Sequence, residues 1–181
     1  MAVYVAMLRG INVGRHKRIK MEPLRKSFEG LGFEQVKTYI QSGNVVFNTA
    51  KLASAGLSKR IEASILGDFG HSVSVILRTL DEMGETIETN PFMKKRGIDQ
   101  AKLHVMFLPE SPVPSDLKQL ERLTAAPDQS RCLGKEIYLY LPNGVAESLA
   151  SNPLERRLLK RATMRNWRTV GNLYRMCLDC G

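Results

Sequence analysis

Two segments of the chain contain the residue types best suited to binding an anion. The first is a basic loop punctuated by glycines, residues 8–21, with the sequence LRGINVGRHKRIKM. Glycine lets a loop turn its peptide N–H groups towards an anion, and arginine and lysine supply the opposite charge. The candidate ligand-binding residues of this loop are Arg9, Gly10, Asn12, Gly14, Arg15 and Lys17. The alternative is a solvated turn in which the glycines serve only the backbone geometry.

The second segment, residues 163–175, has the sequence TMRNWRTVGNLYR. Its polar residues recur at spacings of three, four and three, which predicts one face of an amphipathic helix capped by Thr163. The indole of Trp167 falls on the apolar face, so core packing is favoured over stacking on a base. Guanidinium and amide groups bind phosphates and base edges, which makes Arg165, Asn166 and Arg168 the candidates here. The alternative is a solvated polar face.

The charge of the chain is concentrated in these two segments. The 181 residues carry a net charge of +9, and in each of the ranges 9–26 and 155–175 seven Lys or Arg face one Glu. A basic surface of this kind favours phosphate-rich partners, either nucleic acid or a phosphorylated small molecule, although solubility alone is also served by it. A P-loop is excluded, because Walker A requires lysine directly after its second glycine and Gly14 is followed by Arg15.

Composition indicates a protein of the cytoplasm. No apolar run approaches the roughly 20 residues of a membrane span, and the start MAVYVAMLRG lacks a secretory signal, so we expect no membrane partner. Three cysteines argue for reduced thiols rather than a disulfide framework. Cys177 and Cys180 form a C-x-x-C pair, but the sequence offers no motivated further ligands for a zinc site. We therefore expect no metal and no cofactor.

The elements that must position these segments follow a recognisable order. Apolar patterns predict strands at 2–8, 33–40, 45–47 and 72–78, with helices near 21–31 and 57–65. The order β-α-β-β-α-β is that of a ferredoxin-like antiparallel sheet in an α+β protein. A capping box formed by Thr79 and Glu82 then opens a short helix.

The pattern begins again after residue 100. A strand at 102–108, a helix after Ser115 and two strands around Gly134 are followed by helical sequence, including a helix opened by Asn152 and Pro153. We therefore predict a second ferredoxin-like unit that is incomplete, with its last strand replaced or lost, and a C-terminal amphipathic helix. The predicted domains are 1–79 and 80–181.

Three motifs carry a family resemblance: LRGINVG, the hairpin TYIQSGNVVF at 38–47 and TMRNWRTVGNL at 163–173. Together they resemble a bacterial family catalogued as domain of unknown function 1697. The resemblance implies a ferredoxin-like α+β architecture, in agreement with the pattern above. It implies no activity and no catalytic residues. Arg15 stands where a further glycine is common in that family, which makes the loop stiffer and more basic.

Three hypotheses for function follow. The first is a protein that binds an anionic ligand through the two basic segments acting as one site. The second is an enzyme acting on a phosphorylated or carboxylated metabolite at the interface of the two halves, for which the sequence identifies no catalytic residue. The third is an interaction module that dimerises through a sheet face or edge. The sequence leaves the oligomeric state open.

Overall fold

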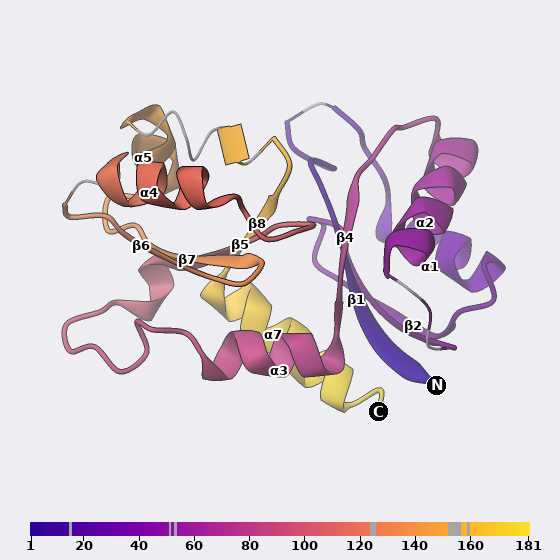
Figure 1. The fold of residues 1–181 in the computed structure, drawn as a ribbon. Helices are drawn as coiled ribbons and strands as arrows, with labels where there is room; N and C mark the ends of the chain where they lie inside the picture. The colour runs from indigo at the N-terminus through magenta and orange to yellow at the C-terminus, as the bar shows by residue number, and fades with distance from the viewer. Residues whose placement is uncertain (15, 51, 53, 124–125, 152–156, 159) are drawn as a thin grey trace. The chain divides into compact units, whose positions relative to one another are not determined.

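The chain is organised as two compact units, each with its own sheet (Figure 1). The computed structural model describes residues 1–181 except 15, 51, 53, 124–125, 152–156 and 159. The first unit contains Met1–Glu85 and Asn172–Gly181, and the second contains Thr86–Gly171. The domain boundaries predicted from the sequence, 1–79 and 80–181, concern independent folding and stay a prediction.

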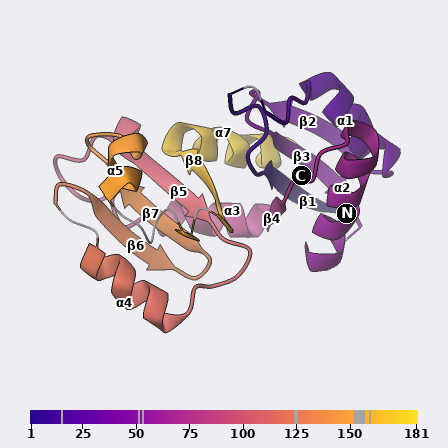
Figure 2. The ribbon, with the colours of Figure 1, turned by 90° about the horizontal axis from the view of Figure 1, so that it is seen from above.

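The first unit is a four-stranded antiparallel sheet in the order β2-β3-β1-β4. Its elements are β1 (Ala2–Leu8), α1 (Met21–Gly30), β2 (Glu34–Tyr39), β3 (Asn44–Thr49), α2 (Ser54–Phe69) and β4 (Val75–Thr79). Both helices lie over one face of the sheet, as Figure 2 shows. Leu24 and Phe28, one helical turn apart on α1, and Ile61 on α2 are buried against Phe47 of β3 and its neighbours. This apolar core holds the strand ends from which the loops emerge.

The second unit repeats this topology, with strand order β6-β7-β5-β8. Its elements are the 3-10 helix η1 (Gln100–Lys102), β5 (Leu103–Phe107), α4 (Pro114–Leu123), β6 (Gln129–Leu133), β7 (Glu136–Tyr140), α5 (Val145–Ser151) and β8 (Thr163–Asn166). Leu120 of α4 packs with Met106 and Ile137 of the sheet. The chain enters this unit through α3 (Leu80–Glu88) and leaves it through α7 (Trp167–Leu178).

The predicted α+β class of two antiparallel sheets and a C-terminal amphipathic helix is confirmed. One detail was wrong, because Thr163–Asn166 forms β8, which pairs with β5 and completes the second sheet. Thr163 is therefore a strand residue, and Asn166 caps α7 by accepting a hydrogen bond from the Thr169 amide at 2.8 Å. A four-residue strand with Thr and Asn at its ends resembles a helix start in sequence. The predicted opening of a helix at Asn152 and Pro153 lies outside the described residues.

The last ten residues belong to the first unit. Asn48 of β3 donates through Nδ2 to the carbonyl oxygen of Cys180 at 2.8 Å, and both residues are buried. Leu173 and Cys177 are also fully buried. The C-terminal half of α7 is thus part of the packing of the first sheet. Among the described helices, none has both the length and the apolarity needed to cross a membrane.

Candidate anion-binding site

The side chain of Asn12 makes hydrogen bonds within the β1–α1 loop and to the β2–β3 turn. Its Nδ2 donates to the carbonyls of Ile19 (2.8 Å) and Gln41 (2.7 Å), and its Oδ1 accepts from the Ile19 amide (2.9 Å). Asn12 itself has a φ of 55°, a left-handed conformation that asparagine tolerates well. Asn12 therefore closes the loop and ties it to the β2–β3 turn, and its hydrogen-bonding groups are used by the protein.

Gly43 joins the loop to the same turn. Its carbonyl accepts from the Leu8 amide at 2.8 Å, and its φ is +74°. A Cβ atom here would lie 2.5 Å from Cδ1 of Ile11 and 2.9 Å from Cβ of Leu8, closer than atoms can approach. Only glycine fits this position, so the motifs LRGINVG and QSGN are packed against each other as one structure.

The cations of the loop extend from this framework. The Lys17 ammonium donates to the Ser72 carbonyl at 2.6 Å, and Arg18 and Lys20 are exposed. Across the described residues, no carboxylate pairs with Lys17, Arg18 or Lys20. The positive charge of the loop is therefore left to attract a ligand or counter-ions from solvent.

The nearest carboxylate in the sequence, Glu22, is engaged elsewhere. Its side chain lies 2.7 Å from the Arg25 guanidinium and 3.9 Å from the Lys26 ammonium. The hydrogen bond from Arg25 lowers the pKa of Glu22, which remains a carboxylate at neutral pH. Glu22 thus compensates the charge of its own helix and not that of the loop.

The two predicted loop glycines adopt left-handed backbone conformations. Gly10 and Gly14 are exposed, with φ values of 68° and 61°, and a Cβ at either would meet nothing within 4 Å. Among the described residues, neither N–H group donates to a backbone carbonyl. Backbone conformation, rather than lack of space, explains glycine here. Arg15, the remaining predicted loop residue, lies outside the described residues.

A second group of polar side chains in the first unit lies at the end of β2. Asn172 donates through Nδ2 to the Tyr39 hydroxyl, and Arg175 donates to Oδ1 of Asn172. The next residue after Tyr39, Ile40, is 50% exposed and has a φ of 49°. A β-branched residue in the left-handed region is strained, typically by about 1–3 kcal/mol, and such strain is common at functional sites. The sequence predicted the polar helix face but not its link to Tyr39.

The predicted candidates of the second basic segment lie in the second unit and differ in exposure. Arg165 is 8% exposed, and its Nη1 donates to Oγ1 of Thr163 (2.6 Å) and to the Met164 carbonyl (2.8 Å). Burial lowers the pKa of Arg165 to about 10. Asn166 caps α7, and Arg168 in its first turn is exposed. That these residues and the loop of the first unit form one site stays a prediction.

Cys177 of the C-x-x-C pair has little thiolate character at neutral pH. Cys177 and Cys180 are free and buried, and burial together with Cys180 raises the pKa of Cys177 to about 12. Thiolates, not thiols, bind metals and attack disulfides. In the described part of the chain, no three His, Cys, Asp or Glu side chains gather as a metal site would require.

The fold and the loop together define an α+β protein of two four-stranded sheets that carries a preformed basic loop on the first. The sequence profile of the protein family described as "Protein of unknown function (DUF1697)" matches residues 1–138. The chain belongs to this family, as the three sequence motifs indicated.

One solved structure is similar over almost the whole length of the chain. It is that of the conserved bacterial protein SP0830 from Streptococcus pneumoniae, with 23% sequence identity, a TM-score of 0.75, and coverage of 97% of this chain and 98% of that chain. At this identity the likeness establishes the fold alone. A search among curated proteins gave no match.

Proposed function

We propose that the first unit binds a phosphate-bearing ligand, a nucleotide or single-stranded nucleic acid, on the surface formed by the β1–α1 loop and the β2–β3 turn. We call this the loop–turn surface; its proposed ligand-binding residues are Arg9, Gly10, Gly14, Arg15, Lys17, Arg18, Lys20 and Arg175. The observation that carries the proposal is a basic loop that Asn12 ties to the β2–β3 turn, with no carboxylate paired to Lys17, Arg18 or Lys20 in the described residues. A preorganised binding surface loses less entropy when it takes up a ligand.

Apolar side chains beside these cations favour a ligand with more than a phosphate group. Val13 is 68% exposed and Ile40 is 50% exposed. They are the sequence neighbours of Asn12 and Gln41, whose hydrogen bond joins loop and turn. A nucleobase or a similar flat apolar group is suited to contact them, while the phosphate meets the cations.

The predicted candidates of the second basic segment lie in the second unit and are proposed as a separate candidate site. Arg168 is an exposed cation in the second unit and a direct candidate for phosphate contact. Arg165 and Asn166 act by holding the end of β8 and the start of α7. Free thiols at all three cysteines support the further proposal that the protein works in the reducing cytoplasm.

The test is binding of a labelled single-stranded RNA of about 12 nucleotides, measured by fluorescence anisotropy between about 50 and 200 mM salt, with ATP as competitor. Affinity should fall as salt rises. The double variant Arg18→Glu, Lys20→Glu should reduce affinity at least tenfold and lower the salt dependence of log K by about 1 to 1.5.

The matched control is Lys59→Glu, Lys94→Glu, which changes two exposed lysines outside the loop–turn surface by the same total charge. The control should change affinity by less than about threefold. Equal losses in both double variants mean attraction by net charge alone and contradict the proposal, as does an absence of RNA and ATP binding at low salt. Displacement of RNA by ATP at equal phosphate concentration assigns the surface to nucleotides.

A further inference from the structure

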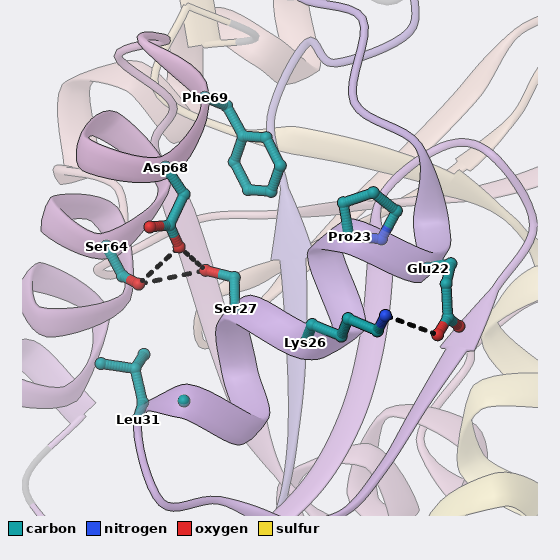
Figure 3. A pocket seen from close by; sticks show the side chains of 9 residues that line it. Glu22, Pro23, Lys26, Ser27, Leu31, Ser64, Asp68 and Phe69 are labelled. Atoms are coloured by element: carbon teal, nitrogen blue, oxygen red, sulfur yellow. Dashed lines mark hydrogen bonds and ion pairs between the residues drawn. The ribbon is translucent and has the colours of Figure 1, made fainter.

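A cavity of about 550 Å³ opens between α1 and α2 in the first unit (Figure 3). Its size falls in the range of pockets that hold small molecules. It shares no residue with the loop–turn surface. The residues that line it are Glu22, Pro23, Lys26, Ser27, Gly30, Leu31, Ser64, Asp68 and Phe69.

The polar wall of this cavity is a cluster of two hydroxyls and one carboxylate. Ser27 donates to Oδ2 of Asp68 at 2.5 Å. The Ser64 hydroxyl lies 3.0 Å from that of Ser27 and 3.3 Å from the same carboxylate oxygen (Figure 3). Ser27 is only 9% exposed, so its geometry is fixed by packing.

Counting protons shows what this wall can offer a ligand. Each serine has one hydroxyl proton. The proton of Ser27 goes to Asp68, and the proton of Ser64 goes either to Ser27 or to Asp68. The groups left over, Oδ1 of Asp68 and lone pairs of Ser64, are acceptors. The wall therefore favours a ligand that brings hydrogen-bond donors.

The charge of the wall is negative. In the part of the chain that the structure describes, no Lys, Arg or His forms an ion pair with Asp68. Lys26, the cation that lines the cavity, lies 3.9 Å from Glu22 instead. A carboxylate that accepts from Ser27 and has no cation paired with it in the described residues is complementary to a positively charged donor.

We propose that this cavity binds a small organic cation, a primary amine with an apolar body. The ammonium has three donors and no acceptor, which matches the acceptors of Asp68 and Ser64. The apolar body has Leu31, Phe69 and Pro23 to pack against. A carboxylate ligand is repelled by Asp68.

The test is a titration of the isotope-labelled full chain with butylammonium and phenethylammonium chlorides, followed by NMR. Saturable shifts are expected in the amides of Ser27, Gly30, Ser64 and Phe69. The matched alcohols, butanol and 2-phenylethanol, should bind at least about threefold more weakly because they lack the charge.

Asp68→Asn keeps the shape of the wall and removes its charge, and should lower amine affinity about threefold or more, the loss expected for an exposed carboxylate. The control is Asp81→Asn, an exposed carboxylate in the first turn of α3 that does not line the cavity and should leave affinity unchanged. The native spectrum of each variant verifies that it is folded. Equal binding of amines and alcohols, unchanged affinity in Asp68→Asn, or saturation by calcium ions alone with no amine binding would each overturn the proposal. None of these outcomes affects the loop–turn surface, which is probed by RNA.

Discussion

The two units place very different loops at the same topological position. In both, the strand-end leucine donates its amide to the hairpin turn: Leu8 to Gly43 at 2.8 Å, and Leu108 to Lys135 at 2.9 Å. The first unit then inserts the basic loop before its helix, whereas the second has the short sequence PESPV at 109–113. The single charge of that sequence, Glu110, is paired with Arg161. The basic loop is therefore not required by the fold, and its charge needs another explanation.

The interiors of the two units, by contrast, have a buried arginine at the same position of the last strand. Arg78 of β4 stands opposite Val5, and Arg165 of β8 stands opposite Val105. Each guanidinium donates through Nη1 to the carbonyl of the preceding residue at 2.8 Å. Each arginine is buried directly before a residue that caps the next helix. The two units share this buried arginine and differ in the loops.

The largest predicted effect is on stability, and it tests whether the two buried arginines play equivalent roles. Arg78→Ala and Arg165→Ala should each lower the free energy of unfolding by about 3 kcal/mol, because each leaves a cavity and unpaired polar groups in the interior. Urea unfolding measures the loss. Arg96→Ala, at an exposed position, should change stability by less than about 0.5 kcal/mol. A difference of more than about 2 kcal/mol between the two buried variants would show that the arginines are not equivalent.

The hairpin turns should differ in their tolerance of a side chain. Gly43→Ala should cost about 3 kcal/mol, since the new Cβ meets Ile11 at 2.5 Å and φ is +74°. Gly134→Ala should cost about 1 kcal/mol, because its φ is +58° but the nearest atom lies 3.8 Å away. Thermal unfolding of the two variants measures both losses of stability. Equal losses would mean that the loop and the turn of the first unit are not packed as described.

A smaller effect on the free energy of unfolding should appear at alkaline pH. Because the pKa of Cys177 is raised to about 12 from an ordinary value of 9.0, the folded protein holds this proton while the unfolded chain loses it. Stability should therefore be complete below pH 9 and fall as pH rises, by about 1 kcal/mol at pH 10. Cys177→Ala should show a shallower decline. Cys132→Ala should give a similar change at about pH 10 and a smaller one above about pH 11, because burial raises the pKa of the partly exposed Cys132 only to about 11. An identical pH profile in wild type and Cys177→Ala would contradict the burial argument.

The smallest effect concerns strain in the first hairpin turn, which the second turn lacks. Ile40→Gly should raise stability by about 0.5 to 1 kcal/mol, because glycine adopts the φ of 49° without strain but loses more chain entropy. The same variant should weaken RNA binding by removing an exposed apolar contact. Increased stability with unchanged binding would remove Ile40 from the loop–turn surface.

Much of the fold was predictable because the apolar patterns are strong. The spacing of Leu57, Ile61 and Ile65 predicted one buried helix face, and all three are buried in α2. The capping box at Thr79 and Glu82 forms both of its hydrogen bonds. Strand β8 was missed because four residues are too few to show a period of two, and the pattern there was assigned to the following helix. That assignment placed Arg165 on a surface, whereas it is buried.

The residue types of the candidate site were predictable from the sequence, but the contacts that shape it were not. Charge and glycine content singled out the loop, yet its rigidity depends on contacts between distant residues, from Asn12 to Gln41 and from Gly43 to Ile11. A single sequence carries no signal for such pairs. The cluster of Ser27, Ser64 and Asp68 was missed for the same reason, since it exists only when two helices meet.

The hydrogen bond from Asn48 to Cys180 has a consequence for the order in which the two units can fold during synthesis. It joins residues 132 positions apart, with the whole second unit, Thr86–Gly171, between them in the chain. On the ribosome, the last segment of the first unit, Asn172–Gly181, is made only after the whole second unit. The second unit, although made later, therefore has all of its residues available for folding before the first unit does.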